Sequence, residues 1–522
     1  MTTRTAHTAA RRGRDRKAEV LRPAPGRDRF APGDAPSVAV VGGGIAGLAA
    51  ATGLAERGAR VTLYEREESL GGRLAGQRTR LADGSEVTMT RGFHAFFRQY
   101  YNLRGLLRRT DPGLDRLTPL PDYPLRHSGG LTDSFARVPR TPPLSALGFV
   151  ALSPTFGWRD LTSMDARAAL PLLDVRVPEV YERFDRVSAT GFLQGVRFPE
   201  AAHHLAFEVF SRSFFADPRE LSAAELMLMF HIYFLGSSEG LLFDVPDEPF
   251  PQALWEPLGD YLERLGTDIR TGTAVHGVDP LDGEGGAEVR TDAGTGRYDA
   301  VVLALDTGGL RGTVAASPGL GTAPWRADID ALRTAPPFLV SRFWLDRAVR
   351  PDRPGFLGTS GYEGLDNISV LERYEGEAAR WAARTGGSVV ELHGYAVPEG
   401  ADWEKVQDEL LAQLRRVYPE TSRARVVDVR HEWRADCPMF TAGTHHRRPT
   451  VTTPHPWLTL AGDGLRCDLP VALMERAATT GFLASNELLA RWGVRGQVLW
   501  TVPRAGRSPA LRALGALAGR RP

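Results

Sequence analysis

The first residues that could do chemistry are three glycines and one carboxylate near the start of the chain. Gly42, Gly44 and Gly47 stand in GxGxxG spacing, and Glu65 follows eighteen positions after Gly47. Glycines at this spacing allow a tight turn and let backbone N–H groups approach a pyrophosphate. A carboxylate at the later position accepts hydrogen bonds from both hydroxyls of a ribose, and it argues against a 2′-phosphate. The four residues predict a dinucleotide site.

The segments around these residues have the pattern of a nucleotide-binding fold. Ser37 to Val41 is a valine-rich run typical of a strand buried on both faces, and an Ala/Leu-rich helical stretch then reaches about Arg57. Arg60 to Tyr64 is a second predicted strand. A bare GxGxxG could be an ordinary glycine turn. The order of strand, glycine turn, helix, strand and acid favours the nucleotide fold.

A second glycine-containing segment lies near the other end of the chain. Trp457 to Leu460 is a predicted strand, Gly462 and Asp463 form a turn, and Val471 to Ala490 has a helical pattern. The N-terminus of a helix carries a partial positive charge and free N–H groups, which suit an electron-rich ring. Asp463 could simply cap the turn. Its pairing with the first glycine segment favours contact with the nucleotide.

The sequence after Glu65 resembles one superfamily in particular. Gly71, Gly72 and Arg73 are similar to the extended dinucleotide fingerprint of the flavin amine oxidases and phytoene desaturases. The resemblance implies FAD as the cofactor. It also implies an α/β fold, in which a Rossmann-like FAD-binding domain of the GR2 flavoprotein type carries an inserted α+β substrate domain. Asp463 would lie near the flavin ribityl chain, and Arg73 would either meet a cofactor phosphate or end a turn at the surface.

Two further segments are expected to return to the FAD-binding domain. Asp268 to Val278 is interpreted as a strand whose Val275 matches a position that contacts adenine in relatives, and Tyr298 to Asp306 as another buried strand. A purely structural β-ribbon would also fit these segments. The expected cofactor ligands are Gly42, Gly44, Ala46, Gly47, Glu65, Arg66, Gly72, Arg73, Arg91, Gly92, Phe93, Val275, Gly462, Asp463, Leu473 and Met474.

An aromatic run follows the first fingerprint. Gly92 to Phe97 (GFHAFF) and the Tyr100 to Leu103 segment resemble the stretch of plant-type carotene desaturases that passes beside the flavin ring. Gly92 would let the backbone approach the flavin, and His94 would line the start of a substrate channel. A cluster of aromatics is otherwise typical of an ordinary core.

The GFHAFF run and the helix LPVALMERAATTG are most similar to the isorenieratene synthase subgroup of carotenoid β-ring desaturase/methyltransferases. Glu475 keeps the acid of the family helix, while Arg476 replaces its glycine. The resemblance implies an FAD-dependent oxidoreductase that desaturates and aromatises carotenoid β-ionone rings, converting β-carotene to isorenieratene. Hydride abstraction to the flavin, a 1,2-methyl shift and proton loss would do this without S-adenosylmethionine.

The catalytic base is less well defined than the cofactor site. The candidates are His94, His231, Glu239 and Asp244. His94 is best placed because its motif ties it to the flavin, although it could position substrate instead of moving a proton. His231 could be an ordinary core histidine, and the two acids could be loop residues.

Three other functions remain open. The first is desaturation of a linear carotene of the phytoene or ζ-carotene type. The second is amine oxidation, which usually needs a lysine near the flavin, and this sequence has almost no lysine. The third is a non-catalytic FAD-binding escort protein.

Length and composition set the expected domain plan. The 522 residues are enough for two or three domains, and a net charge of +1 gives no general attraction to nucleic acid. Two lone cysteines predict no metal site and suit a reducing cytoplasm. The plan is a disordered basic arm (1–35), FAD-binding parts (36–98, 241–310 and 446–500), a helical substrate and membrane-contact part (99–240), a substrate-domain sheet (311–445) and a basic C-terminal tail (501–522). The sheet part is predicted to hold the strands Phe338 to Leu345, Ser388 to Val397 and Arg425 to Trp433 and one helix, Trp403 to Val417.

The expected partners are a carotenoid and the inner face of the cell membrane. No run of eighteen apolar residues predicts a spanning helix, so attachment would be peripheral. Ser145 to Phe156 and Leu226 to Leu235 are apolar candidates for the contact, although both could be core helices. The tail from Pro503 could form an amphipathic helix on an anionic surface or remain frayed. The sequence indicates no oligomeric state.

Overall fold

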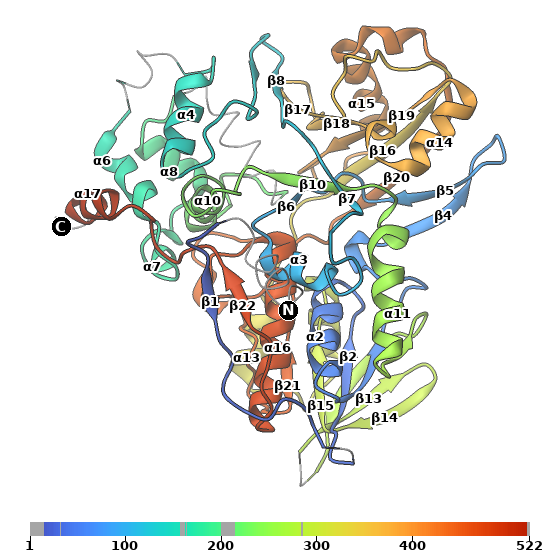
Figure 1. Ribbon diagram of the computed structural model, residues 1–522, viewed down its shortest axis with the longest axis vertical. Coiled ribbons are helices and arrows are strands. Elements are labelled where there is room, and N and C mark those ends of the chain that lie inside the picture. The colour runs from blue at the N-terminus through green and yellow to red at the C-terminus, as the bar shows by residue number, and fades with distance from the viewer. Residues whose placement is uncertain are drawn as a thin grey trace, which may run out of the picture.

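The computed structural model describes residues 15–31, 33–156, 162, 164–199, 215–282 and 285–518. Three regions are visible in Figure 1. A nucleotide-binding body occupies the lower part, a β-sheet with two helices lies at the upper right, and a helical lobe lies at the upper left. Among the described residues, no helix is both long and apolar enough to cross a bilayer.

A five-stranded parallel sheet forms the centre of the lower body. Its order is β11-β3-β2-β15-β21, and each neighbouring pair is parallel. The strands are β2 (Ser37–Val41), β3 (Arg60–Tyr64), β11 (Asp268–Arg270), β15 (Ala300–Leu303) and β21 (Leu458–Leu460). Helices over residues 45–55 and 473–491 pack on this sheet, and its central strands are almost wholly apolar and buried. The predicted α/β class with a Rossmann-like domain is confirmed.

Two helices from opposite ends of the chain pack tightly beside this sheet. They are α2 (Ile45–Ala55) and α16 (Leu473–Arg491). A Cβ on Gly481 would lie 2.2 Å from the Ala46 carbonyl oxygen, and one on Gly53 would lie 2.3 Å from Ser485 Oγ. The two glycines therefore permit the close approach of the helices, which brings the second glycine segment to the first.

The structure corrects two predicted strands. Residues 268–278 form the parallel strand β11 and then β12 (Val275–Pro280), which belongs to a different, antiparallel sheet with β13 (Ala287–Thr291) and β14 (Gly294–Tyr298). Gly272, with φ +62°, lies in the turn that separates β11 from β12. Tyr298 ends β14, so the buried strand begins only at Ala300. Two short strands separated only by a turn give one continuous pattern in the sequence, even when they belong to different sheets.

The upper sheet has seven strands in the order β20-β16-β19-β18-β17-β8-β9. They are β8 (Leu125–His127), β9 (Thr132–Asp133), β16 (Phe338–Leu345), β17 (Phe356–Ser360), β18 (Asn367–Val370), β19 (Ser388–Gly394) and β20 (Val426–Arg434). The predicted helix is α15 (Trp403–Val417). The prediction of a single helix here was incomplete, because α13 (Ala323–Asp330) and α14 (Gly376–Thr385) also form. Each buries too few apolar residues to give a clear pattern.

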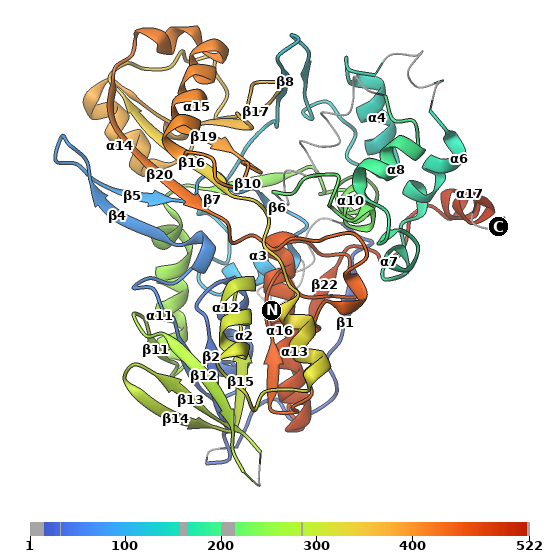
Figure 2. The same cartoon turned by 180° about the vertical axis from the view of Figure 1, so that it is seen from behind.

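Shorter elements connect the body to the upper regions. The strands are β4 (Gly76–Arg80), β5 (Glu86–Thr90), β6 (Phe96–Phe97), β7 (Leu117–Pro119) and β10 (Phe243–Pro246). The helices are α3 (Tyr101–Leu107), α11 (Glu256–Arg264) and α12 (Thr307–Ala315). Figure 2 shows α12 and α13 from the side that Figure 1 hides.

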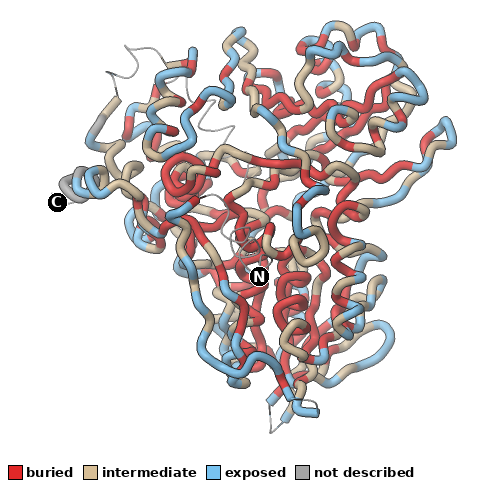
Figure 3. The backbone as a smooth tube through the Cα atoms, in the orientation of Figure 1, coloured by how far each residue is buried: buried red, intermediate tan, exposed pale blue. Residues whose placement is uncertain are grey.

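The helical lobe contains both of the apolar segments that are candidates for membrane contact. Its helices are α4 (Leu144–Leu152), α6 (Ala166–Ala169), α7 (Glu179–Phe184), α8 (Ala189–Gly195) and α10 (Ala223–Phe230). On α4, Leu144, Leu147 and Leu152 are each more than half exposed. For residues 226–235 the core alternative holds, because α10 and the following π-helix (His231–Leu235) are buried, as the tube in Figure 3 shows.

The chain ends are more ordered than expected. Strand β1 (Glu19–Leu21) pairs with β22 (Leu499–Thr501), and the Arg507 guanidinium lies 2.6 Å from the Asp15 carboxylate. The prediction of a disordered basic arm is therefore wrong for residues 15–31. Residues 1–14 lie outside the described part of the chain. The tail forms helix α17 (Pro509–Ala518).

Candidate active site

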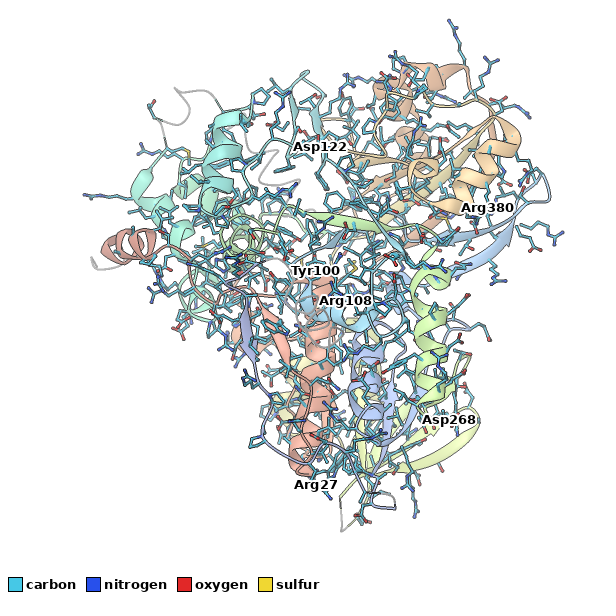
Figure 4. All side chains as sticks on the ribbon, in the orientation of Figure 1. Arg27, Tyr100, Arg108, Asp122, Asp268 and Arg380 are labelled. Atoms are coloured by element: carbon cyan, nitrogen blue, oxygen red, sulfur yellow. The ribbon has the colours of Figure 1, made fainter. Side chains whose placement is uncertain are left out.

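A large cavity connects the nucleotide body to the upper sheet. Its volume is about 1440 Å³, more than the roughly 300–1,000 Å³ of a typical ligand pocket. Gly42, Glu65 and Val275 line its nucleotide end, while Phe135 and Tyr395 line the other. In Figure 4, Tyr100, which also lines the cavity, lies centrally between Asp268 of the body and Asp122 near the upper sheet. The space is large enough for a dinucleotide and a second molecule.

Glu65 lies at the carboxyl end of β3, where it is held against the glycine turn. Its Oε2 accepts a hydrogen bond from the Gly43 N–H at 2.7 Å, and its Oε1 accepts one from the Glu67 N–H at 2.9 Å. Each carboxylate oxygen keeps a second lone pair. The side chain is thus held in place at the cavity wall, as a ribose-binding carboxylate requires.

The three motif glycines have different physical roles. Gly42 has φ +107°, and a Cβ there would lie 2.3 Å from the Ala304 carbonyl oxygen. A Cβ on Gly47 would lie 1.8 Å from the Gly42 carbonyl oxygen, so Gly47 serves helix–strand packing and does not line the cavity. Gly44 borders the cavity, has φ −77°, and would place its Cβ no closer than 3.7 Å to protein. The fold therefore does not require a glycine at position 44, whereas a closely bound pyrophosphate does.

The N-terminus of α2 is open toward this space. Its N-cap residue, Gly44, supplies no side-chain hydrogen bond, so the first N–H groups of the helix remain available to a phosphate. The N-terminus of α16 is similar: its N-cap, Ala472, makes no side-chain bond, and Leu473 and Met474 line the cavity. Leu473 has φ +52°, a conformation that costs a non-glycine residue about 1–3 kcal/mol.

Arg73 and Asp463, predicted as two separate cofactor contacts, bind each other. Arg73 Nη2 lies 2.5 Å from Asp463 Oδ1, and both side chains line the cavity. Burial would lower the pKa of Arg73, but the Asp463 carboxylate overcomes this and raises it. The pair joins the Gly71–Gly72 turn to the Gly462 turn and presents both groups to the cavity.

The GFHAFF run forms an aromatic wall at the other end. Phe93 stacks on Phe356, with ring centroids 4.0 Å apart, and meets Phe243 edge to face. His94 Nδ1 lies 3.0 Å from the Gly92 carbonyl oxygen, and burial lowers its pKa to about 4. His94 is therefore neutral at physiological pH.

Position 92 requires a glycine for a structural reason that the sequence did not show. It has φ +81°, and a Cβ there would lie 2.3 Å from Glu391 Oε1. Gly92 itself does not line the cavity, although its neighbours Arg91 and Phe93 do. The glycine thus makes room for a buried carboxylate of β19, and the close approach of its backbone to the flavin stays a prediction.

Three of the candidate bases do not line the cavity. His231 is fully buried, and its Nε2 lies 2.7 Å from the Pro503 carbonyl oxygen. Glu239 is buried beside the Tyr101 hydroxyl. Asp244 binds Arg98 and Arg104, the latter at 2.6 Å. His231 belongs to the π-helix, Asp244 to β10 and Glu239 to the segment between them, and none of the three is among the residues that line the cavity.

Most of the residues expected to bind the cofactor lie around this one cavity. All except Gly47 and Gly92 line the cavity, although they lie far apart in the sequence. The residues that sequence reasoning missed are Glu391, His393 and Tyr395. Their signal was present: polar residues alternate in ELHGY at the end of an otherwise apolar strand, which places them on one face.

Helix α16 also fixes the position of the aromatic segment. The Glu475 carboxylate accepts hydrogen bonds from the Asn102 and Leu103 N–H groups, both at 2.9 Å, and so caps α3. Arg476, which replaces the family glycine, lies 2.9 Å from Glu225, and Arg448 lies 2.6 Å from the same carboxylate. The replacement is accommodated by a buried ion cluster.

Comparisons with known proteins identify the class. The model of the flavin containing amine oxidoreductase family matches residues 45–489, and the chain belongs to this family. Among solved structures, putrescine oxidase has a TM-score of 0.63 at 18% identity, covering 87% of this chain and 99% of the other. Cyclohexylamine oxidase from Brevibacterium oxydans also has a TM-score of 0.63, at 15% identity, covering 88% and 99%. These likenesses support the fold, and the family establishes a flavin oxidoreductase with FAD as its cofactor.

Two curated relatives carry the same name. Carotenoid phi-ring synthase from Streptomyces griseus is 73% identical over 509 residues, covering 97% of this chain and 98% of the other. Carotenoid phi-ring synthase from Chlorobaculum tepidum is 28% identical, covering 90% of each chain.

Replacing Gly44 with alanine tests the cofactor site. The added methyl group contacts no protein atom closely, so we expect the free energy of unfolding of the FAD-free protein to change by less than about 1 kcal/mol. The methyl group would intrude on the pyrophosphate, so FAD affinity should fall at least about tenfold, measured by flavin fluorescence titration. Gly312→Ala on α12, which also has open space, is the matched control and should bind FAD normally. Unchanged FAD affinity of Gly44→Ala would contradict this account of the site.

Proposed function

We propose that this chain desaturates and aromatises the β-ionone rings of a carotenoid with a 1,2-methyl shift, converting β-carotene to isorenieratene. The observation that carries the proposal is 73% identity to a carotenoid phi-ring synthase over nearly the whole of both chains. The cavity supports it, because a dinucleotide end continues directly into a space lined by aromatic side chains. A long apolar polyene needs such a lining.

The chemistry of the ring sets what the protein must supply. Conversion of one β-ionone ring to a trimethylbenzene removes four hydrogens, as two hydrides and two protons, while one methyl group moves to the neighbouring carbon. Bound FAD supplies the two-electron acceptor, and a second acceptor such as a quinone must reoxidise it. The protein must orient the ring, exclude water and accept protons.

The aromatic end meets these demands. Phe93, Tyr123 and Phe356 present ring faces and edges to one another, and their π-electrons can stabilise an allylic cation after hydride loss. Neutral His94 adds no competing positive charge. Amine oxidation is less well supported, because the sequence has lysine only at positions 17 and 405 and neither residue lines the cavity.

Pigment analysis of a β-carotene-producing host that expresses this chain tests the proposal. We expect the β-carotene peak to be replaced by a product eight hydrogens lighter, with two aromatic rings, identified by mass and absorbance. A Gly44→Ala strain is the control for dependence on FAD. Unchanged β-carotene beside an FAD-loaded protein would refute the proposal, and conversion of phytoene or ζ-carotene instead would favour the linear desaturase.

We further propose that α4 attaches the enzyme to a bilayer, on the cytoplasmic face of the cell membrane. Leu144, Leu147 and Leu152 are 55%, 63% and 53% exposed. On the buried side of the same helix, Phe149 stacks on Phe135 at 4.9 Å and lies 5.6 Å from Phe234. Both partners of Phe149 line the cavity. A lipid-dissolved substrate would therefore meet an apolar path from the bilayer to the site.

Vesicle flotation tests the attachment. Each exposed leucine contributes roughly 1 kcal/mol when buried in lipid, so the triple Leu144→Gln, Leu147→Gln, Leu152→Gln variant should bind on the order of a hundredfold more weakly. The vesicles would contain phosphatidylcholine and phosphatidylglycerol. Val498→Gln, which changes an exposed apolar residue elsewhere, should bind like the wild type. Equal flotation of the triple variant would rule out α4 as the attachment site.

A further inference from the structure

The end of strand β19 places three functional side chains on one face. Glu391, His393 and Tyr395 alternate along the chain, so they point the same way. His393 and Tyr395 line the cavity, whereas Glu391 lies behind them and is fully buried.

The three side chains form a continuous hydrogen-bonded chain. Tyr395 Oη lies 2.7 Å from His393 Nδ1, and His393 Nε2 lies 2.9 Å from Glu391 Oε1. The Asn367 amide donates to Tyr395 Oη at 2.9 Å, so the phenolic proton is directed to His393. His393 then donates through Nε2 to the carboxylate. The order of donors runs from the cavity toward Glu391.

Glu391 is held as an anion. Burial alone would raise its pKa, but Arg342, which binds Oε2 at 2.9 and 3.0 Å, and His393 lower it to about 2. The Phe93 N–H donates to Oε1 at 2.9 Å, which ties the carboxylate to the GFHAFF wall. A buried anion in this position stabilises an imidazolium if His393 gains a proton.

We propose that Tyr395, His393 and Glu391 form a proton relay that accepts the protons lost from the carotenoid ring. This assignment rests on the proposed function. After hydride loss, a C–H bond next to the cationic carbon breaks, and its electron pair forms the new ring double bond. The proton goes to Tyr395 Oη, and the phenolic proton passes to His393 Nδ1. When product leaves, the same path returns the proton to water.

The arrangement favours this relay over His94. The Nδ1 atom of His94 is engaged by the Gly92 carbonyl oxygen, and burial lowers the pKa of the ring. No hydrogen bond joins His94 to a carboxylate among the described residues. His393 has both a phenol facing the cavity and an anion behind it. The hydrogen bonds within this network offset the cost of burying Glu391 and His393.

His393→Gln is the decisive variant, because a glutamine side chain can keep both hydrogen bonds but cannot take up a proton. We expect kcat for β-carotene to fall at least about tenfold, while the KM for β-carotene, the FAD content and the Tm stay near wild type. Tyr395→Phe should lower kcat similarly. Ser341→Ala, on the adjacent strand β16, removes a buried hydrogen-bonded group outside the relay and should keep full activity.

An isotope effect separates proton transfer from a structural role. The substrate would be β-carotene deuterated at the ring methylene next to the allylic methylene, the position that loses the proton. Deuterium there should lower kcat more in the His393→Gln variant than in the wild type, because proton loss becomes rate-limiting in the variant. A kcat of His393→Gln within threefold of wild type would overturn the relay. The relay would also be overturned if the lower kcat of His393→Gln were accompanied by a lower FAD content or a lower Tm.

A second readout does not depend on turnover. In the FAD-loaded protein, ¹⁵N NMR should show His393 protonated at Nε2 and unprotonated at Nδ1, and protonation at Nδ1 would overturn the relay. A wild-type chain that leaves β-carotene unchanged would overturn the proposed function together with this step. Active wild type with an unaffected His393→Gln variant would overturn the relay alone.

Discussion

The close contact between α2 and α16 is the constraint on which the rest of the structure depends. Gly481 lies against the backbone of α2 and Gly53 against the Ser485 side chain of α16, and an added Cβ would meet atoms at 2.2 Å and 2.3 Å respectively. Overpacking of this kind typically costs about 1–3 kcal/mol. The contact holds the C-terminal segment against the N-terminal nucleotide turn. Both glycine segments therefore lie at the carboxyl ends of strands of the same parallel sheet.

The position of α16 then determines the rest of the site. Its first turn opens on the cavity, and Glu475 in that turn caps α3, which fixes the aromatic run just before it. The Arg73–Asp463 pair lies between the nucleotide end and the aromatic end. The dinucleotide and the second ligand therefore share one continuous space. Beside it, Gly92 leaves room for two side chains of β19, because a Cβ there would lie 2.3 Å from Glu391 Oε1 and 2.5 Å from His393 Nε2.

Much of this arrangement could be predicted from the sequence. Strands β2, β3 and β16 and helix α15 have their predicted bounds, because each has a strong, uninterrupted apolar period. The nucleotide turn was predictable because backbone geometry and packing demand glycine at positions 42 and 47. The bases were not, because a polar residue in the sequence does not show which way a π-helix or a loop turns it. His231 and Asp244 are satisfied structural groups, while His393 gains its role from Tyr395 and from Arg342, which is distant in sequence.

The central claim is that one cavity brings a carotenoid ring to the flavin. Anaerobic mixing of the FAD-loaded protein with β-carotene tests it most directly, by following the absorbance of oxidised flavin in a single turnover. The account predicts that this absorbance disappears as a ring-oxidised carotenoid forms, one oxidation step for each flavin reduced. Flavin that stays oxidised while β-carotene is bound would contradict it.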